Sequence, residues 1–126
     1  MTITEQKAAQ RKAGIAARRA LSDTERTHSN AALCARIMAL DCFKKAENIL
    51  LYAAFGGEAD LSTLAVEAAR QGKMLAYPVC GEGFSLTAAV PGPDGWEVGT
   101  YGIRTPILSR SAVLPPDKLD LVLVPC

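Results

Sequence analysis

Three cationic side chains near the amino terminus have the spacing to meet an anion together. Lys7, Arg11 and Arg18 fall within roughly 40° of one another on a helix of 3.6 residues per turn. Gly14 lies on the same stripe and leaves room for a bulky anion to approach the backbone. A stripe of like charges is also typical of a solvated face of a surface helix, so both interpretations stay open from the pattern alone.

A second candidate is the Phe-Gly-Gly-Glu segment at 55–58, which directly follows the apolar run Asn48–Ala53. In open α/β sheets, ligands bind beyond the carboxyl ends of the strands. Glu58 can accept two hydrogen bonds from a ring N–H and an amino group, and Phe55 or Tyr52 can cover a flat heterocycle. In the structural alternative, Phe55 is core, the glycines form a turn, and Glu58 stabilises the next helix N-terminus.

The remaining candidates carry weaker signals. The segment Gly99–Pro106 combines turn glycines with Tyr101, a composition shared by binding loops and inert loops. Asp117 and Asp120 flank the last apolar run and are interpreted as structural, so no metal ligand is predicted. The four cysteines form no C-x-x-C pair and His28 is the only histidine, which favours free thiols.

Composition narrows the class of protein further. The chain has 126 residues with 49% hydrophobic and 21% charged side chains, which predicts one globular domain over residues 1–126. Its formal net charge of +1 and its 6% aromatic content disfavour a nucleic-acid partner. Neither a signal peptide nor a membrane-spanning run is recognisable, so we expect no membrane partner and a cytoplasmic location.

The elements that must position these residues follow from periodicity and caps. Ser22–Glu25 matches the capping box of a helix amino terminus. We expect three helices: one over 4–20, one from the capping box to just before Cys42–Phe43, and one over 61–71 with Asp60 as its cap. We expect strands over 48–53, 73–78, 84–90 and 119–124, of which 84–90 should be an edge or half-exposed strand. The segment 96–116 is expected to be irregular. The strand–helix–strand order within 48–78 indicates a right-handed βαβ unit.

The end of the chain shapes the expected architecture. The last apolar run, Leu119–Val124, stops at Pro125–Cys126, where a loop after a core strand should begin. A buried strand without a covering helix suggests an incomplete, C-terminally truncated sheet. We therefore expect self-association through this uncovered strand.

The order of these signals resembles the 5-formyltetrahydrofolate cyclo-ligase family, also called methenyltetrahydrofolate synthetases. The resemblance is carried by short blocks along nearly the whole chain: Lys7-x-x-x-Arg11, Ala20-Leu21-Ser22 with Glu25-Arg26, Leu51-Tyr52, Gly57-Glu58-Ala59-Asp60, Gly72-Lys73, Tyr77-Pro78, Gly99 to Ile103, Pro106 and Leu119 to Pro125. It implies a three-layer, sandwich-like α/β fold with a mostly parallel sheet flanked by helices, incomplete at the C-terminus.

The resemblance also implies a reaction and roles for residues. In this family ATP, with Mg²⁺ assisting, phosphorylates the formyl oxygen of 5-formyltetrahydrofolate; attack by a neighbouring nitrogen and loss of phosphate give 5,10-methenyltetrahydrofolate. Lys7 and Arg11 would contact the ATP phosphates. Glu58 would hold the pterin ring, and Tyr52, Phe55 and Tyr101 would help line the folate pocket. No residue is assigned as catalytic.

The same resemblance marks what this sequence lacks. Family members continue with an Arg-rich and Gly-rich loop, ending in Gly-Tyr-Tyr-Asp, that binds nucleotide phosphates and supports the magnesium site. Residues 1–126 contain no such C-terminal nucleotide-binding segment. The alternative to an enzyme is therefore a catalytically inactive fragment that binds folate or another anion.

Overall fold

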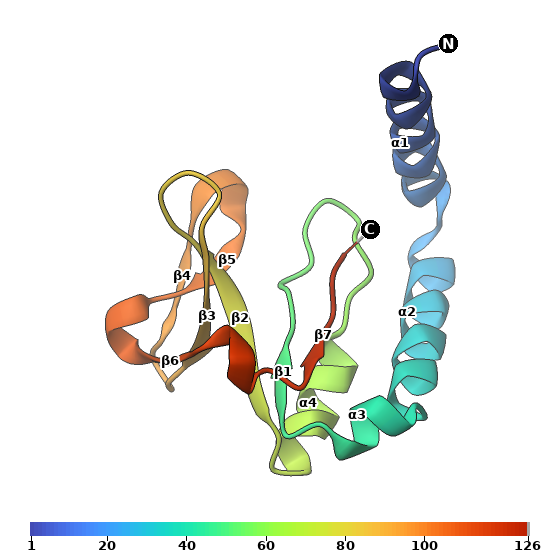
Figure 1. Ribbon diagram of the computed structural model, residues 1–126. Coiled ribbons are helices and arrows are strands. Elements are labelled where there is room, and N and C mark those ends of the chain that lie inside the picture. Colours follow the sequence, from blue (N-terminus) through green and yellow to red (C-terminus); the bar gives the residue numbers. More distant parts are fainter. Residues whose placement is uncertain (126) are drawn as a thin grey trace.

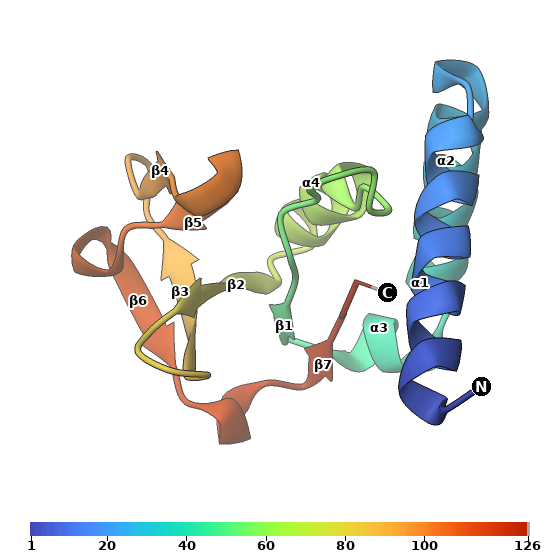
Figure 2. The same ribbon diagram turned by 90° about the horizontal axis from the view of Figure 1, so that it is seen from above.

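The computed structural model describes residues 1–125, without the side chain of Thr100, and shows a mixed α/β fold (Figures 1 and 2). Helices dominate the first half, and short strands the second. The elements are α1 (Ile3–Ala20), α2 (Asp23–Met38), α3 (Asp41–Lys45), β1 (Asn48–Leu50), α4 (Ser62–Arg70), β2 (Met74–Cys80), β3 (Leu86–Pro91), β4 (Trp96–Val98), η1 (Thr100–Gly102), β5 (Arg104–Pro106), η2 (Leu108–Arg110), β6 (Ser111–Leu114), η3 (Pro116–Lys118) and β7 (Leu121–Val122).

Five of the strands form one sheet in the order β6-β3-β2-β1-β7. β1 pairs in parallel with β2 and with β7, whereas β3 pairs antiparallel with β2 and with β6. The predicted βαβ unit is therefore confirmed as β1-α4-β2. β4 and β5 form a separate antiparallel hairpin, which we call the β4–β5 hairpin. The α/β class expected from the sequence is confirmed.

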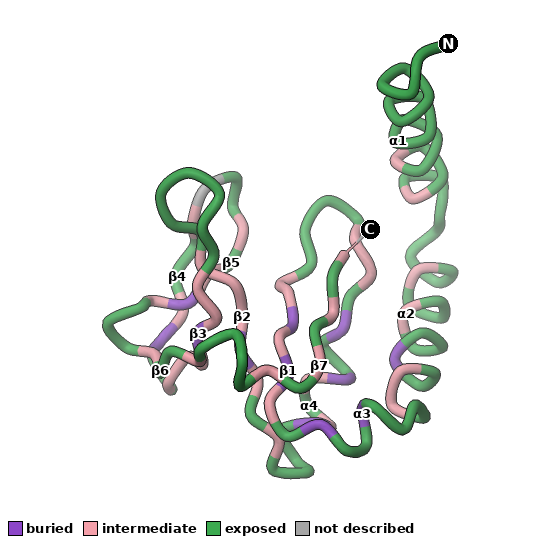
Figure 3. Tube along the Cα trace, in the orientation of Figure 1, coloured by how far each residue is buried: buried purple, intermediate pink, exposed green. Residues whose placement is uncertain are grey.

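The two long helices, α1 and α2, both begin with a capping box. The Ser22 hydroxyl accepts from the Glu25 N–H while the Glu25 carboxylate accepts from the Ser22 N–H, which confirms the predicted capping box. Thr2 and Glu5 repeat this arrangement at α1. These caps satisfy amide groups that a helix amino terminus leaves without partners. Capping, rather than burial, fixes where α1 begins, because α1 has no buried residue (Figure 3).

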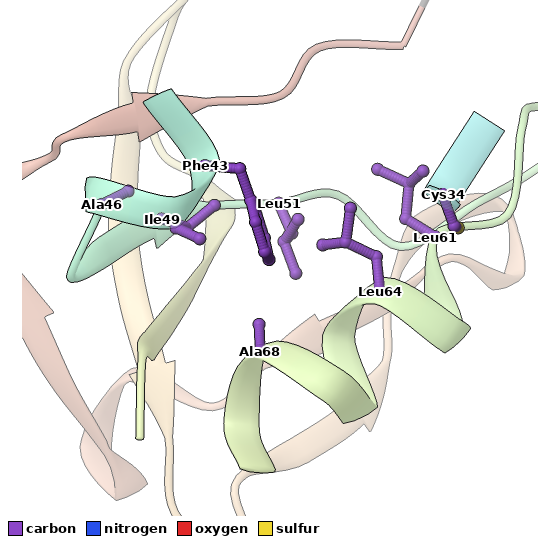
Figure 4. Close-up of a cluster of buried hydrophobic side chains, with 8 residues drawn as sticks. All are labelled: Cys34, Phe43, Ala46, Ile49, Leu51, Leu61, Leu64 and Ala68. Carbon is purple, nitrogen blue, oxygen red and sulfur yellow. The ribbon is translucent and has the colours of Figure 1, made fainter. Parts of the chain in front are cut away.

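The core lies where β1 meets the helices (Figure 4). Ile49, Leu75 and Leu121 are in register on three neighbouring strands, so their side chains share one face of the sheet. Phe43 of α3 and Leu64 of α4 pack in the same cluster as Ile49, and all three are 1% exposed or less. The cluster is completed by Cys34, Ala46, Leu51, Leu61 and Ala68. This packing holds β1 and α4 rigidly together at the point where the loop between them begins.

One prediction about the second half was wrong. The segment 96–116, expected to be irregular, contains β4, β5 and β6. These strands have three or four residues each, too few for a recognisable alternation of side chains. The stretch 84–90 was expected to be an edge or half-exposed strand. The half-exposed alternative is confirmed, since β3 is half-exposed and lies inside the sheet, between β2 and β6.

Asp120 anchors the last strand beside the first. Its Oδ2 accepts from the backbone N–H groups of Glu47 and Asn48, at 3.0 and 2.9 Å. These two bonds favour the carboxylate and hold the pKa of Asp120 below its ordinary value. The structural interpretation of Asp120 is thus confirmed. β7 is shorter than the predicted strand 119–124 and occupies one edge of the sheet; self-association through it stays a prediction.

Cys34, Cys42 and Cys80 are free thiols, as expected, while Cys126 lies outside the described residues. Within residues 1–125, no helix combines the length and the apolar character that crossing a membrane requires.

Candidate functional site

A cavity of about 340 Å³ opens beyond the carboxyl end of β1. It lies between the start of α4 and the β4–β5 hairpin, with β2 contributing Tyr77. In Figure 1 the loop after β1 and the turn of the hairpin lie at the same end of the sheet. Its lining residues are Leu51, Tyr52, Ala53, Ala54, Asp60, Leu61, Ser62, Ala65, Tyr77, Trp96, Gly102 and Arg104. We call it the β1 pocket; its volume is at the lower end of the range for small-molecule sites.

The loop after β1 forms the first wall. The Tyr52 hydroxyl donates to the Ala59 carbonyl oxygen at 2.8 Å, which ties the two ends of the loop together. At its tip, Gly56 and Gly57 have φ angles of 60° and 82°, a pair of positive values that a tight type I′ turn needs. The Glu58 N–H donates to the Phe55 carbonyl oxygen at 3.2 Å and closes this turn. The glycine turn in the structural alternative is confirmed.

Asp60 is placed where this loop enters α4. Its Oδ1 accepts from the Ser62 N–H at 2.9 Å and from the Ser62 hydroxyl. The helix begins at Ser62 rather than at Leu61, so Asp60 provides the predicted capping bond from one position further back. The Asp60 N–H in turn donates to Oδ1 of Asn30 on α2, at 3.2 Å. These contacts fix a carboxylate on the wall of the β1 pocket.

The β4–β5 hairpin forms the second wall. Trp96 pairs with Pro106 and Val98 with Arg104, so Trp96 and Arg104 are diagonal neighbours on one face of the hairpin. The Arg104 guanidinium lies 4.6 Å from the centroid of the Trp96 ring. Trp96 also meets Tyr77 edge to face, with ring centroids 4.6 Å apart. The second wall is therefore a stack of two rings and one cation.

Burial raises the pKa of the Tyr77 phenol above its ordinary value, while the positive charge of Arg104 acts in the opposite direction. The phenol therefore stays protonated at neutral pH. With Asp60 on one wall and Arg104 on the other, the β1 pocket suits a flat ligand that bears both N–H donors and a negative charge.

Of the four residues expected to contact a heterocycle, only Tyr52 lines the β1 pocket. Phe55 is 45% exposed, so the alternative in which it is core was wrong. Oε1 of Glu58 accepts from the Phe55 N–H at 2.9 Å, across the glycine turn. Tyr101 is 82% exposed at the tip of the hairpin, next to the lining residue Gly102. The roles assigned to Phe55, Glu58 and Tyr101 stay predictions.

Lys7 and Arg11 are exposed on α1, as the basic stripe predicted. Lys7 is separated from Arg18 by about 16 Å along the helix axis, at 1.5 Å per residue. Arg18 is the residue of the stripe that lies next to the loop after β1. Its Cβ lies 3.9 Å from the position that a Cβ atom on Gly57 would occupy, and the Arg26 side chain also lies close to that position. The stripe therefore touches the loop after β1 only at its carboxyl end.

The residues missed from the sequence are Tyr77, Trp96 and Arg104. Tyr77 was assigned to a strand and to the block Tyr77-Pro78 of the resemblance, and Trp96 to an irregular segment, but neither was a candidate site residue. Trp96 is the single tryptophan, and Arg104 lies inside the segment Gly99–Pro106 that was already a candidate binding loop. Their convergence depends on the pairing of β4 with β5 and on the packing of the hairpin against β2.

We tested the described residues for metal ligands. They contain no group of three or more His, Cys, Asp or Glu side chains able to hold a metal ion. Mg²⁺ in phosphoryl-transfer sites is held by one or two carboxylates together with substrate phosphates.

The chain is thus a mixed α/β protein with a pocket beyond the carboxyl end of its first parallel strand. The sequence profile of the 5-formyltetrahydrofolate cyclo-ligase family matches residues 3–126, and the chain belongs to this family. No curated protein sequence matches it significantly.

Two solved structures share the fold. The NMR structure of 5,10-methenyltetrahydrofolate synthetase from Aquifex aeolicus is 29% identical, with a TM-score of 0.79 over 94% of this chain and 59% of that chain. A 5,10-methenyltetrahydrofolate synthetase from Mycoplasma pneumoniae is 18% identical, with a TM-score of 0.72 over 94% of this chain and 63% of that chain. The chain thus spans about three fifths of the length of each.

Proposed function

We propose that this chain acts in the ATP-dependent cyclisation of 5-formyltetrahydrofolate to 5,10-methenyltetrahydrofolate, with the β1 pocket as its folate site. The observation that supports this most is the family match over residues 3–126, which includes both walls of the pocket. The aromatic lining suits a pterin ring, which is flat and bears amino and N–H donors. On the pocket wall, such donors would meet the carboxylate of Asp60.

The pocket residues would act by binding and orientation. The attack of the folate nitrogen on the activated formyl carbon takes place within one molecule, and a rigidly held folate keeps the two reacting atoms close together. Tyr52, tied to Ala59, and Trp96, packed on Tyr77, are rigid enough for this task. Phe55, Glu58 and Tyr101 are proposed to close over the ring from the loop and the hairpin.

ATP is proposed as the second substrate, with Lys7 and Arg11 on its phosphates and Mg²⁺ as the accompanying ion. Neither side chain forms an ion pair among the described residues, where the ion pair found joins Arg70 to Glu67. Two unpaired cations on one helix face fit a polyphosphate. Bound Mg²⁺ would offset the charge that develops as the phosphoryl group is transferred.

The direct test mixes the chain with 5-formyltetrahydrofolate, ATP and Mg²⁺ and follows the absorbance of the methenyl product, with reactions lacking ATP as controls. We expect ATP-dependent formation of the chromophore. The double variant K7A/R11A should raise the KM for ATP and leave the Kd for folate unchanged. K44A/K45A, which removes two exposed lysines of α3, is the matched control and should change neither.

The second candidate function is binding of folate or another anion without turnover. Two observations favour this candidate: the β1 pocket is formed by the described residues, and Lys7 and Arg11 do not line it. Saturable binding of 5-formyltetrahydrofolate without chromophore would establish this candidate and contradict the cyclisation by this chain. Absence of both would contradict the two candidates together.

A further inference from the structure

Arg104 is the cation on the wall of the β1 pocket, and its charge has no acidic partner. Among the described residues the ion pair formed is that of Arg70 with Glu67. The acidic residue of the pocket lining, Asp60, is committed through Oδ1 to Ser62 at the start of α4. Positive charge beside a cavity, not neutralised by the protein, favours an anionic ligand group.

The hairpin also holds Arg104 in a conformation suited to recognition. Its guanidinium lies over the Trp96 ring, 4.6 Å from the ring centroid, and Trp96 in turn meets Tyr77 edge to face. Stacking uses the flat face of the guanidinium, whereas its N–H donors lie in the plane and stay available at the edge. An arginine ordered in this way loses less side-chain entropy when it binds a carboxylate through two parallel hydrogen bonds.

The two walls of the pocket differ in the groups they present. The wall at α4 presents the Asp60 carboxylate, and the hairpin wall presents the Arg104 cation. A ligand with N–H donors at one end and a carboxylate at the other would be bound in one direction only. 5-Formyltetrahydrofolate has this polarity, because its pterin ring carries the donors and its glutamate carries two carboxylates.

We propose that Arg104 is a specificity-determining residue that binds a glutamate carboxylate of the folate and so sets the direction in which the substrate enters the β1 pocket. The inference rests on the proposed function, because it takes the folate to be the ligand of this pocket. It assigns to Arg104 a contact with the tail of the substrate, remote from the reacting atoms.

The test measures binding after the charge of Arg104 is removed, after the charge of the ligand's glutamate is removed, and after both are removed. Calorimetric Kd values are measured for 5-formyltetrahydrofolate and for its diamide, in which both glutamate carboxylates are neutral carboxamides of nearly the same size. The proteins are the unmodified chain, Arg104→Gln, Arg104→Lys and the control Arg36→Gln, which removes an exposed cation of α2.

We expect Arg104→Gln to weaken the binding of 5-formyltetrahydrofolate about tenfold and to leave the Kd of the diamide unchanged, since a charge-assisted hydrogen bond is lost only with the first ligand. Arg104→Lys should restore part of the loss because it keeps the charge without the planar fork. Arg36→Gln should change neither value.

Three outcomes would overturn the inference. Equal weakening of both ligands would mean that Arg104 only shapes the pocket. An effect of Arg104→Gln on ATP affinity, with no dependence on the glutamate charge, would assign the cation to a phosphate instead. Failure of the unmodified chain to bind either folate would contradict the proposed function itself, whereas the first two outcomes leave the proposed function standing.

Discussion

Helix α1 and the β1 pocket hold their charged side chains in different ways. α1 presents Lys7 and Arg11 on a helix with no buried residue, held by its cap and by backbone hydrogen bonds. The pocket presents Asp60 and Arg104 from walls that are fixed by side-chain contacts to α2, α4 and β2. The cations of α1 are therefore adjustable, whereas the charges of the pocket are preorganised.

This difference indicates which partner each region suits. A preorganised site loses little entropy on binding and can discriminate between ligands of similar size. Exposed cations on a helix surface attract any polyanion and discriminate weakly. Under the proposed function, this difference predicts that the substrate is selected in the pocket, while α1 supplies charge. The predictions below test this division.

Loss of core packing should disable the pocket most strongly. Leu64 is fully buried between α4 and β1, and Leu64→Ala should lower the free energy of unfolding by about 2–5 kcal/mol. Denaturant unfolding measures this value. Val66, on the same helix but 71% exposed, provides the control, and Val66→Ala should change it by less than about 0.5 kcal/mol. Similar losses for both variants would contradict the placement of Leu64 in the core.

Relief of strain at the hairpin tip should have an intermediate effect. Tyr101 has φ of 61°, a left-handed conformation that a bulky side chain adopts at a cost. Tyr101→Asn should raise the free energy of unfolding by about 1 kcal/mol, because Asn tolerates this region. The same variant should bind 5-formyltetrahydrofolate more weakly if the ring contacts the ligand. A more stable variant with unchanged folate affinity would remove Tyr101 from the site.

Acid should weaken the edge of the sheet through Asp120. Its pKa is lowered in the folded state by hydrogen bonds from Asn48 and Glu47. Its contribution is therefore complete above the ordinary pKa, near 3.8, and is lost as the pH falls through the lowered value. Asp120→Asn should flatten the acid limb of stability against pH. Parallel acid limbs for the unmodified protein and the variant would contradict this role.

The smallest effect is expected on α1. Lys7 and Arg11 lie four residues apart on an exposed face, and their repulsion opposes the helix by about 0.2–0.5 kcal/mol. K7A/R11A should therefore leave global stability unchanged or slightly higher, as thermal unfolding followed by circular dichroism would show. A clear loss of stability would mean that α1 packs in solution against a partner surface and is not an independent arm.

The sequence predicted those features whose causes are local. The capping box at Ser22, the glycine turn at 56–57 and the βαβ unit are set by neighbouring residues and by short-range periodicity. The loop after β1 was therefore placed correctly beyond the carboxyl end of the strand, where part of it lines the β1 pocket; its role in binding stays a prediction. The hairpin wall was missed, because Trp96 and Arg104 meet through pairing between strands of three residues each. Such short strands carry almost no period of their own.

The central claim, that the substrate is selected in the β1 pocket and not along α1, is tested most directly by an NMR titration. Amide and indole N–H resonances of the chain are followed as 5-formyltetrahydrofolate is added without nucleotide. The account predicts saturable shifts of the Trp96 indole and of amides at 51–62 and 102–104, with those of α1 unmoved. Shifts concentrated on Lys7, Arg11 and their helical neighbours, with the Trp96 indole unchanged, would contradict it.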